Sequence, residues 1–542
     1  MSNVAMNICD IIYIAKGFGR CFHELQDDVV CKSHALENRC RETSHGSLQE
    51  TGVSCDDASR HPSPQAPMIS AKSTASAPGA EAPRGKTYRV GTLVYTPAAL
   101  LTVMFWMLLG DLCLQIMEQL PTSLVPLQLR WATASDTLIG FVTGSLPAVL
   151  GILLNPLVGV QSDRHRGKMG RRRPFLLAST PLVMVALLGL GFAKPISEFL
   201  GGLTGAESLA ALKIGWLGGC MAVFVVANTY IMQVYQFLFV DVIPKEVMGR
   251  FVGCYRAVGA LGAFVFHRFM FGKAESHTEM IYVISAVLYG ISFLLLIWKV
   301  KEGEYGPPLP KRTLAKHAAG YFSECFSRSF YLKTYSLAFS FWCAIVPLWS
   351  FLVFFATKPG IDAGYAPTLG LSLESFGQVR GWCALVQVPV FFLVGPLVDR
   401  LHPLRVGMAG MLLSSLTFFA NFLFVHDQAG LTFWLITNFV AQAIYMGAYL
   451  AILPRLLPRR KYGQFFTANQ IFGFAGVALA PVACGWLLET VKDYRYIFVW
   501  CGGCTLAGFI MCVFLYRHWL SLGGDAGYQP PGQDPEPETD SI

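Results

Sequence analysis

The sequence predicts an all-α membrane protein in which twelve transmembrane helices form two pseudo-symmetric halves of six. Three observations predict this fold class: the scarcity of charge, a succession of long apolar runs, and an internal repeat. Of the 542 residues, 54% are hydrophobic and 14% are charged, whereas an average soluble domain carries about 25% charged residues. The mean hydropathy is +0.47. So apolar a chain needs a lipid-facing surface, which argues against a cytosolic enzyme, a secreted disulfide scaffold and a nucleic-acid binder.

Apolar runs follow one another from residue 98 onward. Each is about 20 residues long, which is enough to cross a bilayer core of about 30 Å. We expect the twelve helices at 98–120, 137–161, 174–194, 214–241, 250–272, 279–299, 331–357, 374–398, 404–425, 431–454, 464–488 and 495–517. The runs fall into a first half at 98–299 and a second half at 331–517, joined by a long basic loop at 300–330.

The two ends of the chain lack such runs. We expect a disordered leader at 1–97, where 61–86 is rich in Pro, Ala and Ser, and a disordered tail at 518–542, which contains Pro-Glu-Pro-Glu. An open alternative is that translation begins at Met68, so that 1–67 is not native protein. Any peptide from that segment in the purified native protein would exclude this alternative.

The 15 cysteines do not predict a metal site or a redox centre. Cys501 and Cys504 form a C-x-x-C pair inside an apolar stretch with no second pair, and the leader cysteines and histidines match no zinc-ligand spacing. We therefore expect no metal and no cofactor, with most cysteines packing as small hydrophobic residues. The sequence holds no nucleotide-binding loop and no nucleophile constellation, which argues against an enzyme and against a primary pump.

Lysine and arginine in the loops predict the orientation. One set of loops is strongly basic, at 164–173, 299–333 and 455–461. The other set carries little beyond Arg130, Lys194, Lys213, Lys273, Lys358 and Lys492. We expect the first set and both termini in the cytoplasm, which agrees with an even number of helices, and the protein in the plasma or inner membrane.

The two halves repeat each other in sequence. An ungapped shift of 214 residues superposes positions after the fourth and tenth helices, namely Pro244 on Pro458, Gly249 on Gly463, Phe251 on Phe465, Gly259 on Gly473 and Gly262 on Gly476. A second pair, Gly159-x-x-x-Asp163-Arg164 and Gly395-x-x-x-Asp399-Arg400, follows the second and eighth helices. Parallel repeats of this kind are typical of transporters.

The G-x-x-x-D-R loop resembles that of the major facilitator superfamily. The longer form here, from Ser162-Asp163 to Gly170-Arg171-Arg172-Arg173-Pro174-Phe175, is similar to the sucrose:proton symporters of plants and their animal relatives. It is also similar to bacterial carriers of the glycoside–pentoside–hexuronide:cation symporter group, and the stretch Asp241-Val-Ile-Pro-Lys-Glu246 favours the same branch. The resemblance covers 98–517 and implies the facilitator fold, with the first, fourth, seventh and tenth helices lining a central cavity.

Charged residues at the cytoplasmic helix ends predict a gate. Asp163 and Arg164 can form ionic contacts with the other half when that side is closed, and such contacts set the energy gap between two states. Gly159 would let a neighbouring helix approach closely. The plainer interpretation is a loop that only fixes orientation, which we favour for Arg171–Arg173. The predicted gate comprises Gly159, Asp163, Arg164, Asp241, Arg250, Gly395, Asp399 and Arg400.

Charged residues inside the helices are few. Asp111, Gln115 and Glu118 share one face of the first helix, because their spacings are four and three. A charge at the bilayer centre costs about 2.5–3.5 kcal/mol, so Asp111 is the first candidate for a proton-carrying acid and Glu118 the second. Arg256 and Arg380 are candidate partners. The alternatives are a structural ion pair for the acids and snorkelling to an interface for the arginines.

A polar and aromatic stripe predicts the substrate-facing surface. Amides hydrogen-bond hydroxyl groups and aromatic rings cover the apolar faces of sugars, whereas the alternative is ordinary packing and aromatic interface belts. The resemblance implies that these side chains face the cavity. The candidates are Gln115, Asn228, Gln233, Tyr235, Trp342, Trp349, Asn438, Gln442, Tyr445 and Tyr449.

The resemblance implies a monomeric secondary transporter that takes up a sugar or glycoside, such as a sucrose-like disaccharide, with a proton. Melibiose-type members of the related group use paired aspartates in the second helix for sodium. The second helix here has no acid between 137 and 161, which favours a proton. Alternatives are a carrier of another small solute, an exporter, and a non-transporting receptor or pigment-delivery protein.

Overall fold

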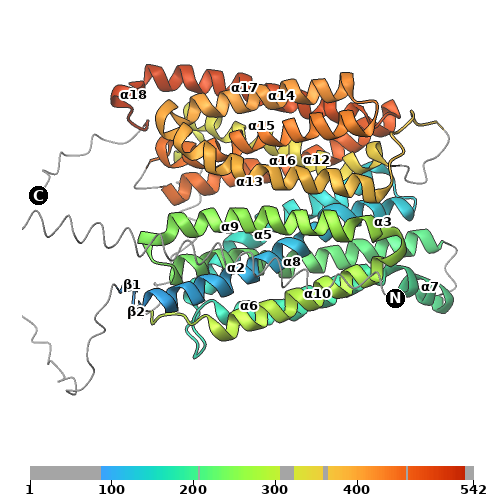
Figure 1. Ribbon diagram of the computed structural model, residues 1–542, viewed down its shortest axis with the longest axis horizontal. Helices are drawn as coiled ribbons and strands as arrows, with labels where there is room; N and C mark the ends of the chain where they lie inside the picture. Colours follow the sequence, from blue (N-terminus) through green and yellow to red (C-terminus); the bar gives the residue numbers. More distant parts are fainter. Residues whose placement is uncertain (1–86, 205–207, 306–322, 358–363, 459–461, 532–542) are drawn as a thin grey trace, which may run out of the picture. The chain divides into compact units, whose positions relative to one another are not determined.

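The computed structural model describes residues 87–204, 208–305, 323–357, 364–458 and 462–531, which belong to one compact unit that begins at Gly85 (Figure 1). The leader up to residue 86, with the alternative start at Met68, lies outside the described residues. So do most of the predicted linker, at 306–322, and the end of the tail, at 532–542.

The chain enters the first half through a short hairpin. Strands β1 (Tyr88–Val90) and β2 (Leu93–Tyr95) pair antiparallel, with Tyr88 opposite Tyr95. This hairpin corrects the expectation that the leader stays without structure up to residue 97. The elements of the first half are α2 (Pro97–Gln119), η1 (Leu120–Leu124), α3 (Val125–Trp131), α4 (Asp136–Gly140), η2 (Phe141–Ser145), α5 (Leu146–Arg164), α6 (Arg173–Gly191), α7 (Ala193–Thr204), α8 (Leu209–Val242), α9 (Lys245–Val265), η3 (Phe266–Met270), η4 (Phe271–Lys273) and α10 (Ala274–Lys299).

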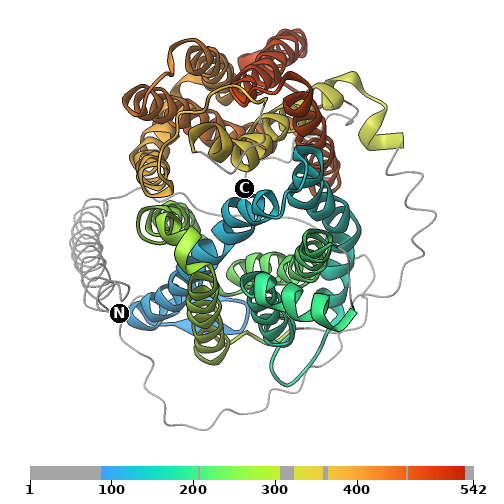
Figure 2. The ribbon, with the colours of Figure 1, turned by 90° about the vertical axis from the view of Figure 1, so that its right-hand side faces the viewer.

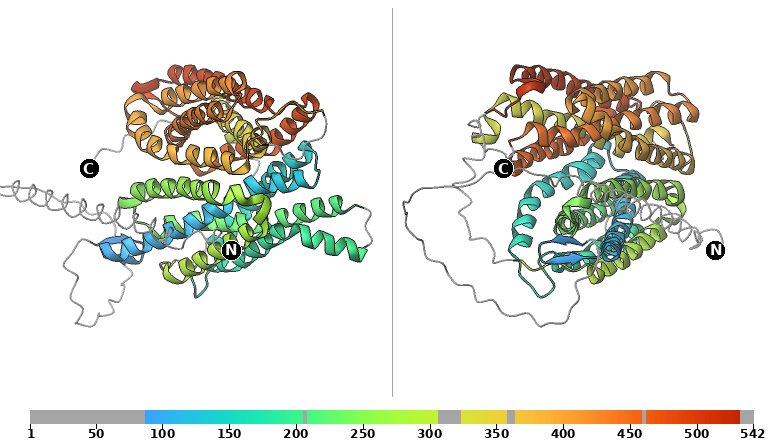
Figure 3. Two further views of the ribbon diagram at one scale, coloured as in Figure 1. Left: turned by 45° about the vertical axis from the view of Figure 1, so that its right-hand side comes forward. Right: turned by 60° about the vertical axis from the view of Figure 1, so that its left-hand side comes forward.

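The second half repeats the arrangement with fewer interruptions. Its elements are α12 (Ser329–Ala356), α13 (Leu373–Leu401), α14 (Pro403–Phe424), α15 (Gln428–Leu456), α16 (Tyr462–Val491), α17 (Tyr496–Ser521) and the short α18 (Gly524–Gly527). Figure 2 and Figure 3 show α2–α10 gathered in one bundle and α12–α17 in another.

The predicted membrane-spanning helices are confirmed. Among the described residues, 11 helical runs are long and apolar enough to cross a membrane. One of them, Glu246–Lys299, is 54 residues long and contains both α9 and α10, the predicted fifth and sixth helices. Each of the twelve predicted segments therefore corresponds to a helix. Helix α7 was not predicted, because the loop before the fourth helix carries no long apolar run.

Local sequence explains where several helices begin. The side chains of Thr96, Ser135, Ser208 and Ser372 accept hydrogen bonds from backbone N–H groups three residues on, at 3.1–3.3 Å. Asp427 does the same for α15 at 2.7 Å. Such N-caps satisfy donors that the first turn of a helix leaves free. Three π-helical turns, η1, η2 and η3, interrupt helices of the first half.

The helices have two distinct ends. The basic end carries the loop between Arg164 and Arg173 together with residues 300–305, and the far end carries Trp131–Asp136 and Val491–Tyr496. The first residues of the predicted tail are ordered at the basic end, which corrects the expected boundary at 518. There the Tyr528 hydroxyl donates to the Leu456 carbonyl at 2.7 Å, so the tail packs on the helix ends of the second half.

Candidate functional site

The two halves meet at the far end along a seam of small residues. Gly140 and Gly144, on the helix that α4, η2 and α5 form together, lie against the backbone and ring of Pro481 on α16. A Cβ atom at Gly485 would lie 2.5 Å from the Asp136 carbonyl oxygen. Side chains at these glycines would force the helices apart, so the seam depends on their absence.

A second seam mirrors the first on the other side of the molecule. A Cβ atom at Gly377 on α13 would lie 2.5 Å from the His267 carbonyl oxygen, and one at Gly381 would lie 3.5 Å from the Arg268 Cβ atom. The shift of 214 residues carries His267 onto Pro481. The two seams are therefore equivalent contacts of the internal repeat.

Among the described residues, a buried ionic cluster joins the halves beside the first seam and not beside the second. Arg130 pairs with the fully buried Asp136 at 3.4 Å. The Tyr494 hydroxyl lies 3.0 Å from both Asp136 oxygens and 2.5 Å from the Arg130 guanidinium, and the Tyr365 hydroxyl donates to Asp136 at 3.2 Å. Burial, followed by the Asp136 charge, raises the pKa of Tyr494 and of Tyr365, so both phenols stay protonated as donors.

Glu489 extends this cluster onto the backbone of the first half. Its carboxylate accepts hydrogen bonds from the Thr137 N–H at 2.7 Å and from the Thr137 hydroxyl at 2.9 Å. We call Arg130, Asp136, Thr137, Tyr365, Glu489 and Tyr494 the far-end latch. Sequence analysis treated Arg130 only as a loop charge and missed the others, because their partners lie hundreds of residues away in the chain.

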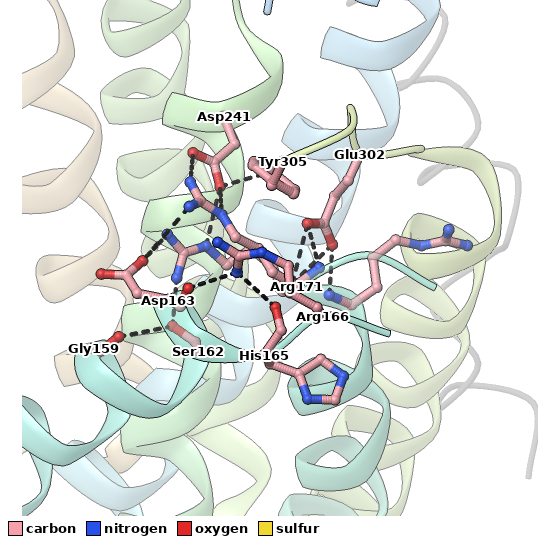
Figure 4. A network of polar contacts seen from close by, with 11 residues as sticks. Gly159, Ser162, Asp163, His165, Arg166, Arg171, Asp241, Glu302 and Tyr305 are labelled. Atoms are coloured by element: carbon pink, nitrogen blue, oxygen red, sulfur yellow. Dashed lines mark hydrogen bonds and ion pairs between the residues drawn. The ribbon is translucent and has the colours of Figure 1, made fainter. Parts of the chain in front are cut away.

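At the basic end, the predicted gate acids bind arginines of their own half (Figure 4). Asp163 pairs with Arg172 at 2.6 Å. Asp241 pairs with Arg171 at 2.7 Å and with Arg172 at 3.0 Å. The arginines that we assigned to orientation are therefore the centre of an ionic network, because the loop folds back over the ends of α5 and α8.

Glu302 ties the start of the linker to this network. Its carboxylate accepts the backbone N–H groups of Arg171, Arg172 and Arg173 at 2.8–2.9 Å, at the start of α6 (Figure 4). The Tyr305 hydroxyl donates to Asp241 at 3.3 Å. Burial, then the Asp241 and Glu302 charges, raises the pKa of Tyr305, so this phenol remains a donor. The sequence signal was an acidic Glu-Gly-Glu-Tyr stretch in an otherwise basic loop.

Of the other predicted gate residues, those that the structure describes are not engaged in this conformation. Arg164, Arg250 and Arg400 are exposed. A Cβ atom at Gly159 or Gly395 would meet no atom within 4 Å, so the close helix approach expected at Gly159 does not occur among the described residues. The physical reason is that the hydrogen bonds between the halves gather at the far end. The Asp399 side chain lies outside the described part of the chain.

Inside the first half, the two acids of α2 lie in different polar settings. Asp111 is fully buried, accepts a hydrogen bond from Gln115 at 3.3 Å through Oδ1, and has no partner for Oδ2 among the described residues. Glu118 accepts a hydrogen bond from Asn228 on α8 at 2.5 Å. Arg256 on α9 is exposed, and its charge acts on Asp111. Asp111, Gln115, Glu118 and Asn228 form a group of two hydrogen-bonded pairs, and their role in proton coupling stays a prediction.

Arg380 does not belong to that group. It lies on α13 with its guanidinium carbon 5.8 Å from the centre of the Phe439 ring, and its charge acts on His267 at the second seam. His267 in turn contacts the Ser123 hydroxyl at 3.4 Å. The expectation that Arg380 partners Asp111 is therefore wrong for this conformation, because α13 packs on η3 rather than on α2.

Several predicted substrate residues are used in helix packing instead. Asn438 is fully buried and donates to the Thr417 hydroxyl at 2.8 Å on α14. The Tyr445 hydroxyl donates to the Leu337 carbonyl at 3.3 Å, and that of Tyr235 to the Met107 carbonyl at 2.8 Å. These three are removed from direct solute contact here, because a helical stripe of polar residues also suits helix–helix hydrogen bonding. Gln442 donates to Asn438.

The half-buried candidates lie along both halves. Trp342 and Trp349 on α12 are edge to face, with ring centres 6.3 Å apart. The Tyr449 ring is tilted relative to that of Tyr445, with ring centres 5.7 Å apart. The half-buried set comprises Gln115, Asn228, Gln233, Trp342, Trp349 and Tyr449.

Asn469 on α16 was missed by sequence analysis. It is fully buried, donates to the Tyr449 hydroxyl at 2.6 Å, and keeps a side-chain oxygen without a partner among the described residues. The shift of 214 residues places it on Tyr255, which lies beside Tyr235 with ring centres 6.5 Å apart. The repeat could have pointed to it.

The comparison with protein families agrees with this architecture. The family model described as the Major Facilitator Superfamily matches residues 90–436 and 348–538. Among curated proteins, a sucrose transport protein of Oryza sativa subsp. indica is 40% identical over 53 residues, 10% of each chain. The Proton-associated sugar transporter A of Homo sapiens is 27% identical over 180 residues, 31% of this chain and 23% of its own. These matches span less than a quarter of either relative.

Solved transporter structures share the fold. The inward open xylose transporter XylE from E. coli superposes with a TM-score of 0.57 at 12% identity, covering 77% of this chain and 96% of its own. The nucleoside transporter NupG gives 0.59 at 11% identity, covering 76% and 100%. Identities this low establish the fold alone. Together with the family match and the apolar helices, they identify the chain as an integral membrane transporter that belongs to the Major Facilitator Superfamily.

Proposed function

We propose that the protein is a secondary active transporter that takes up a sugar or glycoside together with protons by alternating access. The observation that carries the proposal is the buried acid Asp111, one of whose oxygens has no partner among the described residues. Its helix has a counterpart in the other half that bears the tryptophans Trp342 and Trp349. The protein works as a monomer, since each half supplies part of one site.

Asp111 supports proton coupling through the energy of its charge. Placing a charged aspartate at the centre of a membrane-spanning helix costs about 2.5–3.5 kcal/mol of free energy. Binding or release of a proton there changes the balance between conformations by an amount of that order. Glu118, held by Asn228, offers a second proton site about two turns away on the same helix.

The half-buried side chains support a neutral, hydroxyl-rich solute. Trp342, Trp349 and Tyr449 present aromatic faces, while Gln115 and Asn228 present amides. The resemblance of short segments to sucrose transport proteins points to the same class of solute.

The arrangement of contacts supports one state of an alternating-access cycle. The far-end latch and the two glycine seams hold the halves together at the far end, whereas Asp163 and Asp241 pair within their own half at the basic end. Because loop arginines and lysines favour the cytoplasm, we place the basic end and both termini there. The structure then corresponds to an inward-facing state in the plasma or inner membrane.

Uptake into proteoliposomes tests this function. Purified protein should accumulate labelled sucrose or a related disaccharide when the lumen is made alkaline, and a protonophore should abolish the accumulation. A sodium gradient alone should not drive it. If no sugar accumulates with either gradient, while a labelled nucleoside or another solute does, the proposed substrate class is wrong.

A further inference from the structure

A basic cavity lies at the basic end of the helices, apart from the helix interior. Its volume is about 670 Å³, and two segments line it: the loop from Arg166 to Arg173 and the linker start from Lys301 to Tyr305. Figure 4 shows Arg166, Arg171, Glu302 and Tyr305 around this region. The transport cycle proposed above gives this cavity no role.

The charges that line the cavity are mostly positive. Five lining residues are cations, namely Arg166, Lys168, Arg171, Arg173 and Lys301, and two are acids, Glu302 and Glu304. The Glu302 carboxylate already accepts hydrogen bonds from three backbone N–H groups at the start of α6. In the described part of the chain, no ion pair is recorded for Lys168, Arg173 or Lys301, and both lysines are exposed. The cavity therefore attracts an anion.

Apolar side chains at the cavity rim place it at the level of lipid headgroups. Met169, which lines the cavity, is 38% exposed. Trp298, three residues before Lys301, is 66% exposed, and the Lys299 ammonium lies 4.1 Å from its ring centre. Exposed tryptophan is typical of the membrane–water boundary. The Arg173 Nε donates to the Ile297 carbonyl at 2.7 Å, so the start of α6 and the end of α10 meet there.

A lipid tail has a matching surface below the cavity. Leu177 on α6 and Ile291 and Leu294 on α10 are exposed in the membrane-spanning part of the same two helices. A phosphate in the cavity would thus have apolar surface beneath it. A soluble phosphate compound has no acyl chains that could cover this apolar surface.

We propose that this cavity binds the headgroup of an anionic phospholipid, with its phosphate among Lys168, Arg173 and Lys301 and its chains along α6 and α10. The site is independent of the solute and of the coupling ion. It adds a lipid ligand to the same loop and linker that hold the network of Arg171, Asp241 and Glu302. Basic pockets at membrane surfaces bind anionic lipids through the same electrostatics.

Native mass spectrometry of the purified full chain in neutral detergent tests the proposal. Titration with dioleoylphosphatidylglycerol should yield a saturable lipid-bound species, and dioleoylphosphatidylcholine should not. The variant Lys168→Gln/Lys301→Gln should bind the anionic lipid about twenty-fivefold more weakly, because each surface cation contributes about fivefold. The variant Lys194→Gln/Lys213→Gln removes the same charge away from the cavity and should bind like wild type.

Two outcomes would overturn the proposal. One is equal binding of dioleoylphosphatidylglycerol by the cavity variant and by wild type. The other is displacement of the lipid by millimolar sodium phosphate with equal thermal protection by phosphate alone, which would make the cavity a phosphate site. Because lipid binding is the readout, failure of sugar uptake would leave this result unchanged, and the reverse also holds.

Discussion

The two halves share a scaffold but differ in the chemistry of their interiors. A Cβ atom at Gly262 would lie 3.3 Å from the Leu112 carbonyl oxygen on α2, and one at Gly476 would lie 2.8 Å from the Phe339 carbonyl oxygen on α12. This pairing makes Gln115 equivalent to Trp342, since Gly259 and Gly473 contact those two side chains. The same register makes Asp111 equivalent to Ala338 and Glu118 equivalent to Ile345 in the repeat. Acids thus occupy one half, and aromatic rings occupy the other.

The far end shows a similar asymmetry on a smaller scale. Both seams rely on glycines, yet only the first has the far-end latch. Where the first seam has Gly485 beside Asp136, the repeat places Phe271 in the second, where its ring lies 6.0 Å from that of Phe376. One contact is ionic and the other is apolar. The difference suggests experiments that weaken each contact in turn.

The largest effect is expected from filling the first seam. Gly144→Val places a branched side chain against Pro481, and overpacking against a backbone costs about 1–3 kcal/mol or more. We expect the far end to remain apart and transport to fall to background in proteoliposomes. Gly218→Ala is the matched control, because a Cβ atom there meets no atom within 4 Å. Full transport activity of the valine variant would contradict the claim that transport requires close packing at this seam.

The far-end latch should follow, with a partial loss of transport where the seam variant loses transport altogether. Asp136→Asn leaves Arg130 buried without its counter-ion, and breaking a buried pair costs about 3–5 kcal/mol. The state closed at the far end should therefore lose population. Cys484, buried beside this region, reports the change, since peptide mapping should find it alkylated by a small maleimide faster than in wild type. If Cys484 in the Asp136→Asn variant were alkylated as slowly as in wild type, the latch would be contradicted. Asp525→Asn is the control variant.

A moderate effect is expected on the aromatic side of the comparison. Trp342→Ala removes a ring that would stack on a sugar, so KM should rise about tenfold, equivalent to about 1.4 kcal/mol. The dependence of uptake on the pH gradient should stay as in wild type, because the acids are untouched. A loss of that dependence in the tryptophan variant would break the proposed division between the halves.

The smallest effect on transport is expected at the linker anchor, where the change should appear in stability instead. Glu302→Gln weakens the charged acceptor for three backbone N–H groups, at a cost of about 1–3 kcal/mol. We expect a lower midpoint of thermal unfolding and faster proteolysis after Tyr305. Glu304→Gln is the natural control, because its side chain is exposed. Equal unfolding midpoints and equal proteolysis rates of the two variants would show that Glu302 does not anchor the linker.

Sequence reasoning predicted the fold well because lipid imposes a simple rule. A spanning helix must be long and apolar, so Asp111 and Glu118 were conspicuous inside one. The rule does not specify π-helical turns. Gly140 and Gly159 are 19 residues apart, whereas Gly377 and Gly395 are 18 apart, and the turn η2 absorbs the additional residue. This insertion hid the correspondence of Gly140 and Gly377 from the ungapped shift that superposes Gly159 on Gly395.

The site was predicted less completely, for a different physical reason. A polar residue on an apolar helix satisfies the same pattern whether it faces a solute or a neighbouring helix. Asn438 and Tyr235 turned out to bond neighbouring helices. The far-end latch could not be read from sequence, because Asp136 and Tyr494 are 358 residues apart. Repeat equivalences, as with Asn469, were the signal that remained unused.

The central claim is that the acids of the first half couple transport to protons while the second half contacts the solute. The most direct test compares gradient-driven accumulation with sugar exchange at equal pH in proteoliposomes of Asp111→Asn. We predict that the variant loses accumulation and retains exchange, because the solute contacts are intact and the proton site is gone. Accumulation at the wild-type level by the Asp111→Asn variant would contradict the account.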